Sequence, residues 1–154
     1  IRAYKDAGER RMAPLLADML VDTAFHAEEV AGERYGGIVS GTDAVVFVPA
    51  TRTAFRRRGF DHMEAIARPF AEDAGLPLLD ALAKHGASDQ RGLGRSERRE
   101  RARGMYEVVE NVRGMRLLLL DDVVTTGATM RASAAALKDA GAAAVDGLAL
   151  ARVW

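Results

Sequence analysis

Four consecutive leucines at residues 117–120, followed at once by Asp121 and Asp122, constrain the fold of this chain more than any other feature. A short and wholly apolar run of this kind is typical of a strand that is buried on both faces of a parallel sheet. Residues 123–127 then predict a short loop with hydroxyl side chains and one glycine, which opens into a helix. Because open α/β sheets bind ligands at the carboxyl ends of their strands, the two aspartates are candidate ligand-binding residues.

The rest of the chain is consistent with an α/β fold. Alternating strands and helices predict a right-handed, mostly parallel sheet with helices on both faces. Pro69 is expected to kink one helix, and Gly141 is placed to end another. Helices are predicted at residues 12–20, 61–74 and 128–140, strands at 44–48, 105–109, 117–120 and 145–153, a strand or turn at 78–82, and a long polar connection at 86–104.

Length and composition exclude several classes of protein. Of the 154 residues 49% are hydrophobic and 29% charged, so we expect residues 1–154 to form a single globular domain. No apolar stretch approaches a bilayer span and no export leader opens the chain, so a soluble cytoplasmic protein is the default expectation. Cysteine is absent, which excludes disulfides and cysteine-bound zinc in this segment. The chain begins at Ile1, which we interpret as the product of cutting or processing a longer protein.

Charge is balanced overall but unevenly distributed. The 22 basic residues offset 22 acidic ones, so no net field draws the chain onto nucleic acid. Of the basic residues 19 are arginine, and ten of these lie at residues 52–58 and 91–103. Arginine holds planar oxyanions in a fixed geometry better than lysine does, so the clusters indicate segments suited to oxyanions.

The segment after the leucines has the chemistry of a phosphate-binding loop. Backbone N–H groups at the start of a helix, together with the helix dipole, favour a phosphate dianion. Thr125, Thr126 and Thr129 can add hydroxyl donors, and Gly127 allows the backbone to approach phosphate oxygens closely. The lysine of a nucleotide triphosphate loop and the spaced glycines of a dinucleotide turn are both missing.

The adjacent carboxylates of Asp121 and Asp122 narrow the ligand further. They would repel a polyphosphate unless a neutral group or a metal ion lay between the two. The vicinal hydroxyls of a sugar meet this condition, because carboxylates accept hydrogen bonds from a diol while the loop takes the 5-phosphate. The residues alone therefore predict a site for a ribose 5-phosphate unit.

Residues 117–129 also resemble the phosphoribosyl pyrophosphate (PRPP) signature of the type I phosphoribosyltransferases. Further marks span nearly the whole chain: Tyr4-Lys5, Val48-Pro49, Arg57-Arg58-Gly59-Phe60, Gln90, Leu93, Arg98 and Ala151-Arg152. With these residues the chain resembles the ComF family, which includes the GntX-like proteins. Family members usually carry an upstream cysteine zinc ribbon, which this segment lacks.

The resemblance implies a central, mostly parallel sheet flanked by helices, with a flexible loop and a small hood over the acceptor. It implies PRPP as the substrate and Mg²⁺ as its cofactor. Asp121 and Asp122 would hold the ribose hydroxyls and would contact Mg²⁺ only indirectly, through ribose or water. The residues assigned to the 5-phosphate are Val124, Thr125, Thr126, Gly127, Ala128 and Thr129.

The pyrophosphate of PRPP would face the turn that contains Pro49 and Ala50 in such a fold. Arg57 and Arg58 lie close enough to this turn in sequence to help hold the pyrophosphate. Arg98 would belong to the flexible loop that closes over the reaction, and it is expected to be catalytic together with the two aspartates.

Some positions depart from the family pattern. Asp61 and His62 stand where the family has asparagine and glutamine, and we interpret both His62 and His85 as surface residues. We expect the departures to leave the ribose phosphate site untouched and to affect the acceptor side. The remaining departures are Ala83, His85 and Ala87, where basic residues and a threonine are expected, and Arg101, where asparagine is expected.

The same site residues have ordinary structural interpretations. The two aspartates could be solvated acids at a strand end, with Thr126 as a helix cap. Arg57 and Arg58 could form a solvated basic turn. The arginines of residues 91–103, apart from Arg98, are interpreted as one face of a charged helix.

The leading prediction is a phosphoribosyltransferase that moves ribose 5-phosphate from PRPP to an unknown nitrogenous acceptor base and releases pyrophosphate. Two alternatives stay open: a non-catalytic PRPP-binding or regulatory protein, and a ComF-type accessory protein that binds single-stranded DNA during DNA uptake. Zero net charge and the small aromatic content weigh against the DNA-binding alternative. No membrane partner is expected, and the sequence leaves a homodimer open.

Overall fold

The core of the chain is a sheet of four parallel strands in the order β2-β1-β5-β6. The structure is a computed structural model that describes residues 4, 10–84 and 105–153. The strands of the sheet are β1 (Ala44–Phe47), β2 (Leu78–Leu79), β5 (Arg116–Val124) and β6 (Ala144–Arg152). The predicted α/β class is therefore confirmed, and so are the strands predicted at residues 44–48, 117–120 and 145–153.

Strand β5 lies in the middle of the sheet, between β1 and β6. Its leucines are each at most 1% exposed, as the wholly apolar run predicted. The strand does not end after the leucines but continues through both aspartates to Val124, because β6 remains paired alongside as far as Arg152. The predicted end of this strand at residue 120 is therefore wrong.

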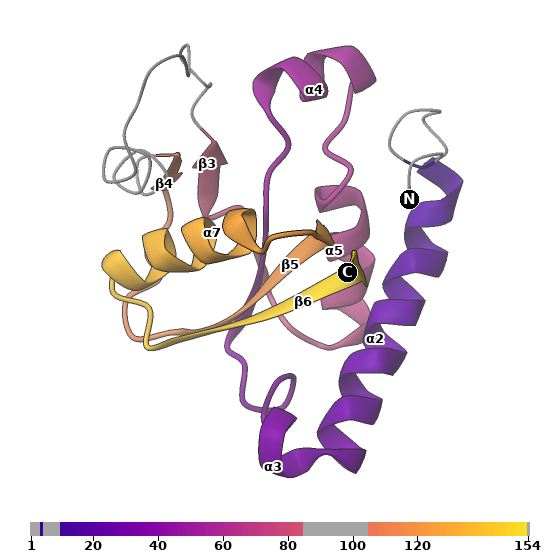
Figure 1. The fold of residues 1–154 in the computed structure, drawn as a ribbon, viewed down its shortest axis with the longest axis vertical. Coiled ribbons are helices and arrows are strands. Elements are labelled where there is room, and N and C mark those ends of the chain that lie inside the picture. Colours follow the sequence, from indigo (N-terminus) through magenta and orange to yellow (C-terminus); the bar gives the residue numbers. More distant parts are fainter. Residues whose placement is uncertain (1–3, 5–9, 85–104, 154) are drawn as a thin grey trace.

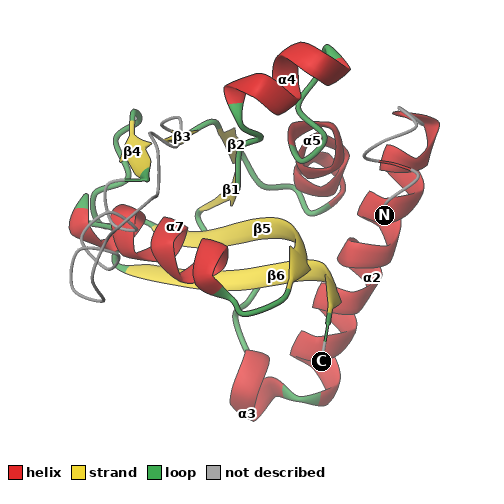
Figure 2. Cartoon of the chain, turned by 45° about the horizontal axis from the view of Figure 1, so that its top comes forward, coloured by secondary structure: helices red, strands yellow, loops and turns green. Residues whose placement is uncertain are grey.

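Helices cover both faces of this sheet, as Figures 1 and 2 show. Helices α2 (Ala13–Val30) and α5 (Glu64–Asp73) pack on one face, and α7 (Ala128–Asp139) packs on the other. Because side chains alternate along a strand, Leu118 and Leu120 join the core under α2 and α5, whereas Leu117 and Leu119 join the core under α7. None of the helices in the described part of the chain combines the length and apolar composition that a transmembrane segment needs.

The three predicted helices are confirmed as α2, α5 and α7, and α2 extends ten residues beyond the predicted end at residue 20. Pro69 lies inside α5, which continues from there to Asp73. Gly141 follows α7 with a positive φ of 101°, a conformation that suits glycine after a helix end. A 3-10 turn, η1 (Arg10–Met12), precedes α2, and the short helix α3 (Gly32–Tyr35) follows it.

A second, smaller sheet pairs β3 (Leu82–Lys84) with β4 (Tyr106–Val108) in antiparallel fashion. The strand predicted at residues 105–109 is therefore confirmed as β4. The segment predicted as a strand or turn at 78–82 contains β2, which joins the main sheet, and the start of β3. The long connection predicted at residues 86–104 lies outside the described residues.

Helix α4 (Arg52–Arg58) follows the loop after β1 and was not predicted. The Thr51 hydroxyl accepts a hydrogen bond from the Ala54 N–H at 3.2 Å and caps the start of this helix. Gly59 ends it in the left-handed conformation, with a φ of 76°. The interpretation of Arg57 and Arg58 as a basic turn is therefore wrong, because both arginines lie on a capped helix.

Candidate functional site

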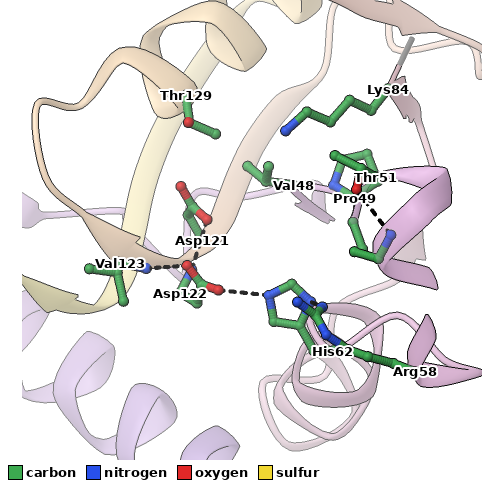
Figure 3. A pocket seen from close by; sticks show the side chains of 12 residues that line it. Val48, Pro49, Thr51, Arg58, His62, Lys84, Asp121, Asp122, Val123 and Thr129 are labelled. Carbon is green, nitrogen blue, oxygen red and sulfur yellow. Dashed lines mark hydrogen bonds and ion pairs between the residues drawn. The ribbon is translucent and has the colours of Figure 1, made fainter. Parts of the chain in front are cut away.

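Asp121 and Asp122 lie inside β5, where successive side chains point to opposite faces of the sheet. Asp122 shares the face of Leu118 and Leu120, towards α5, whereas Asp121 shares the face of α7 (Figure 3). Each aspartate is only 6% exposed. The interpretation of the pair as solvated acids at a strand end is therefore wrong, and the two carboxylates reach one cavity from different faces of the strand.

Asp122 is held by His62, which lies just before α5. His62 Nε2 lies 2.6 Å from Asp122 Oδ2, and His62 Nδ1 lies 3.0 Å from Arg58 Nη1. His62 is 7% exposed, so its interpretation as a surface residue is wrong. The expectation that the departures leave the ribose site untouched is also wrong at this position, because the ring contacts a predicted site carboxylate.

The two carboxylates also accept hydrogen bonds from the backbone of β5. Asp121 Oδ1 accepts the Asp122 N–H at 2.8 Å, and Asp122 Oδ1 accepts the Val123 N–H at 2.5 Å. Buried charges are costly unless hydrogen-bond donors surround them, so these local bonds help the strand to tolerate two adjacent acids. The acids are thus fixed in place before any ligand arrives.

The two aspartates line a cavity of about 300 Å³ at the carboxyl end of the main sheet (Figure 3). This volume is at the lower end of the range for small-molecule sites. Five segments form its walls: the loop at residues 48–51, α4 with Ala54 and Arg58, His62 before α5, Lys84 at the end of β3, and residues 121–123 with Thr129 of α7.

The predicted phosphate loop connects two sides of this cavity, since Val123 and Thr129 both line it. Gly127 adopts a φ of 71°, and the Thr126 hydroxyl accepts the Ala128 N–H at 3.3 Å. Among the hydrogen bonds of the described residues, none is donated by the backbone N–H groups of Thr125, Thr126 or Gly127. The loop therefore presents donors to solvent at the start of a helix, which is the arrangement that an anion requires.

The loop after β1, with Pro49 and Ala50, forms the opposite wall of the cavity. The Ala50 N–H donates to Asp61 Oδ2 at 2.6 Å, and Asp61 Oδ1 accepts the Met63 N–H at 2.8 Å near the start of α5. The carboxylate of Asp61 thus ties the loop to the helix. It also uses a backbone donor that the predicted pyrophosphate site would need.

The predicted arginines differ in their relation to the cavity. Arg58 lines the cavity, and its Nε is buried with no hydrogen-bond partner among the described residues. Arg57 is on the exposed side of α4 and does not line the cavity. Arg98, like Lys5, His85, Gln90, Leu93 and the arginine cluster at 91–103, lies outside the described residues.

Sequence reasoning missed two basic residues near the site. Lys84 reaches the cavity from β3, with its Nζ 5.3 Å from the centre of the Tyr106 ring. Arg131 of α7 lies over the phosphate loop, since a Cβ built on Gly127 would be 2.8 Å from Arg131 Nη1. The position of Arg131 four residues after Gly127 could have revealed it, because residues at this spacing share one face of a helix.

A second cavity of about 310 Å³ shares Pro49, Ala50 and Lys84 with the first. Its walls carry the carboxyl groups of Asp61, Glu64, Asp80 and Glu107. Burial raises the pKa of Asp80, and the charges of Glu64, Asp61 and Glu110 raise it further. These four carboxyl groups outnumber the two basic side chains of the cavity, Arg52 and Lys84, and disfavour phosphate, so the first cavity is the better candidate for an anionic ligand.

Tyr4 connects the start of the chain to the site, because its buried hydroxyl donates to the His62 carbonyl oxygen at 2.7 Å. Burial raises the pKa of Tyr4 to about 12, and the charge of Asp61 adds to this effect. The folded state favours the neutral phenol, so its contribution to stability is present below about pH 10 and is lost as the pH approaches 12.

We therefore expect Tyr4→Phe to be less stable than the wild type by about 1 kcal/mol at neutral pH, where the hydrogen bond is intact. The difference should shrink as the pH rises above about 10, because only the wild type has to keep an ionisable phenol protonated. Urea unfolding of both proteins across this pH range measures the effect. Parallel stability curves would contradict it.

The residues present can contribute to a Mg²⁺ site only in part. Across residues 10–84 and 105–153, no group of three or more acidic or histidine side chains is arranged to hold a metal ion. Carboxylate oxygens are suitable ligands for Mg²⁺, which commonly rests on one or two carboxylates, substrate phosphates and water. Asp121 and Asp122 therefore fit an ion that is shared with a phosphorylated substrate.

Comparison with known proteins identifies the family. The phosphoribosyl transferase domain family matches residues 54–152. The DNA utilization protein YhgH of Escherichia coli K12 is 27% identical over 148 residues, which cover 95% of this chain and 63% of that protein. The competence protein ComFC of Streptococcus pneumoniae is 31% identical over 107 residues, covering 70% of this chain and 47% of that protein.

A solved structure supports the same fold. Glutamine PRPP amidotransferase from B. subtilis matches with a TM-score of 0.53 and 24% identity, over 75% of this chain and 25% of that chain. The chain therefore spans less than two thirds of the length of these relatives. The resemblance to the ComF family is confirmed by YhgH and ComFC. The chain belongs to the phosphoribosyl transferase domain family.

Proposed function

We propose that this protein is a PRPP-dependent phosphoribosyltransferase. One observation carries the proposal. The loop at the start of α7 has backbone N–H groups that donate no hydrogen bond among the described residues, and it adjoins a cavity lined by two buried carboxylates. Amide donors suit a phosphate, and carboxylates suit the hydroxyls of a sugar. Ribose 5-phosphate combines the two chemistries in one fragment.

Each part of PRPP is assigned to the side chains or backbone groups of the cavity that suit its charge or its hydrogen-bonding groups. The 5-phosphate would bind the loop at residues 124–129, where Arg131 adds a positive charge. The ribose hydroxyls would donate to Asp121 and Asp122, which accept but cannot donate when ionised. The pyrophosphate would lie towards Arg58 and Lys84, the basic residues of the opposite wall.

In the proposed reaction, a nitrogen atom of the acceptor attacks the anomeric carbon of PRPP and forms a C–N bond with inversion. The C–O bond to pyrophosphate breaks, pyrophosphate leaves with the bonding electron pair, and the acceptor nitrogen loses its proton to water. Positive charge develops on the ribose ring in the transition state, close to the two carboxylates. Catalysis would depend mainly on positioning the reactants and on neutralising pyrophosphate by Arg58 and Lys84, with Arg98 as the catalytic residue expected on the closing loop.

Mg²⁺ is the proposed cofactor, and it would supply positive charge to the pyrophosphate oxygens when bound with PRPP. Asp121 and Asp122 would contact it through ribose or water. Holding the substrate hydroxyls in place remains their main role.

Titration of PRPP into the protein, with and without Mg²⁺, tests the proposal directly. Calorimetry should detect saturable binding that Mg²⁺ strengthens, and a panel of nitrogenous bases should include one that triggers pyrophosphate release. Saturable binding without release on any base would favour the non-catalytic regulatory alternative. No binding in either condition would overturn the proposed function.

A matched pair of glycine variants isolates the role of the loop. Gly127 and Gly75 both have positive φ values, of 71° and 66°, so alanine costs about 1–2 kcal/mol of backbone strain at either position. Only Gly127 belongs to the site, and there the added Cβ also meets the Arg131 guanidinium. An added methyl group would hinder the close approach of phosphate oxygens to the loop. We therefore expect Gly127→Ala to bind PRPP about tenfold more weakly, a loss of about 1.4 kcal/mol in binding free energy. Gly75→Ala should bind like the wild type, and equal affinities for both variants would contradict the assignment.

DNA binding is the second candidate function, because YhgH and ComFC are named for DNA utilization and competence. The exposed arginines of α4, which are Arg52, Arg56 and Arg57, are the described residues best suited to phosphate backbones. Retention of single-stranded DNA at low salt, lost as salt rises, would support this function. Failure to retain DNA at low salt would exclude it for this chain.

A further inference from the structure

Three side chains that line the cavity, from three segments of the chain, form one line of polar contacts. Arg58 is the last residue of α4, His62 precedes α5, and Asp122 belongs to β5, 60 positions further along the chain. The contacts are Arg58 Nη1 to His62 Nδ1 at 3.0 Å and His62 Nε2 to Asp122 Oδ2 at 2.6 Å. The sequence assigns Arg58 to the pyrophosphate and Asp122 to the ribose hydroxyls, and His62 connects the two side chains (Figure 3).

The donors and acceptors in this line can be assigned from chemistry alone. A guanidinium group carries only donors, so Arg58 must donate to His62 Nδ1, which must then be unprotonated. A histidine ring that lacks a proton on Nδ1 carries it on Nε2, so Nε2 donates to the Asp122 carboxylate. Arg58 thus selects the tautomer of His62 that can hold Asp122.

The backbone of His62 is also held in place. The Tyr4 hydroxyl donates to the carbonyl oxygen of His62 at 2.7 Å. Asp61 Oδ1 caps the start of α5 by accepting the Met63 N–H, one residue after His62. With 7% of His62 and 6% of Asp122 exposed, the contact between them is shielded from water, where a charge-assisted hydrogen bond is stronger.

We propose that His62 is a positioning residue, which holds the Asp122 carboxylate in the orientation that accepts a ribose hydroxyl. This inference rests on the proposed function. Oδ1 is directed by the Val123 N–H and Oδ2 by His62, so rotation of the carboxylate would break two hydrogen bonds. Each carboxylate oxygen has two lone pairs, so a hydroxyl can bind while His62 keeps its contact. His62 acts through Asp122 and need not touch the substrate.

Two substitutions separate positioning from simple packing. Glutamine keeps both functions of the ring, because its amide oxygen can accept from Arg58 while its amide N–H₂ donates to Asp122. Leucine fills similar space in a buried position but can neither donate nor accept. His26→Leu on the exposed surface of α2 is the matched control for replacement of a histidine.

Calorimetric titration of PRPP with Mg²⁺ provides the affinities. We expect His62→Leu to bind PRPP 10- to 100-fold more weakly than the wild type, and His62→Gln to recover most of this loss. His26→Leu should have no effect. Circular dichroism and urea unfolding of each variant establish that the compared proteins are folded.

Nitrogen-15 NMR of the imidazole rings in the ligand-free wild type determines the tautomer independently of any enzymatic activity. We expect a protonated Nε2 and an unprotonated Nδ1 for His62. The His62 signals are assigned by their absence from the spectrum of His62→Gln. A proton on Nδ1 would overturn the inference, as would equal PRPP affinities of the wild type and His62→Leu. Failure of the proposed function would give a different result, because the wild type itself would then show no saturable binding of PRPP. In that case the positioning role of His62 would also be wrong.

Discussion

Replacing both site aspartates, as Asp121→Asn with Asp122→Asn, should weaken PRPP binding by roughly 100-fold to 10,000-fold. Hydrogen bonds to charged groups contribute about 1.5–3 kcal/mol each, and about 1.4 kcal/mol corresponds to tenfold in affinity. Asparagine keeps the size of the side chain, but at position 122 its one amide oxygen can accept from His62 Nε2 or from the Val123 N–H, and not from both. The loss should therefore come from the weaker acceptors that face the ribose hydroxyls and from a less firmly held side chain at position 122.

An opposing effect makes this variant informative. PRPP is strongly anionic, so removing two negative charges from the cavity also reduces repulsion of the ligand. If repulsion of the phosphates dominated, the double variant would bind PRPP more tightly than the wild type, and the assignment of the acids to ribose would be wrong. Calorimetric titration decides between the two effects. Asp146→Asn, at an exposed position of β6, removes a charge from the same sheet and should leave PRPP affinity unchanged.

Leu118→Ala should lower the free energy of unfolding by about 2–5 kcal/mol, the range for leucine truncation in a close-packed core. Leu118 is fully buried in the central strand, and it packs in the core that β5 shares with α2 and α5. Urea unfolding followed by circular dichroism measures the loss. Leu15→Ala, at a position of α2 that is 58% exposed, should change stability by less than about 0.5 kcal/mol. Similar losses for both variants would contradict the packing described here.

The local pattern of residues 117–129 was sufficient to predict a buried strand, a loop and a helix. Four leucines in succession can be buried only where both faces of a strand are covered, and β5 meets this condition. The end of α7 before Gly141 was also predictable, because the left-handed conformation that follows a helix favours glycine. Both features depend on neighbours in sequence.

Features that depend on distant partners were not predictable. The strand was expected to end where the acids begin, but pairing with β6 extends it through Asp121 to Val124. His62 was interpreted as a surface residue because its local sequence says nothing of Asp122, whose carboxylate lies 2.6 Å away in the folded chain. The capped helix α4 was missed although Thr51 and Gly59 are ordinary start and stop signals. The assignment of Arg98 to a closing loop stays a prediction, since that residue lies outside the described residues.

The hydrogen bond between Ala50 and Asp61 has a consequence for the leaving-group side of the cavity. Because an internal carboxylate already occupies this amide, an incoming phosphate oxygen can bind it only by exchange, with one anion replacing another. The gain in affinity at this point is then the small difference between two similar bonds. Discrimination between PRPP and its products would consequently come from the arginine and lysine side chains of that wall, not from its peptide groups.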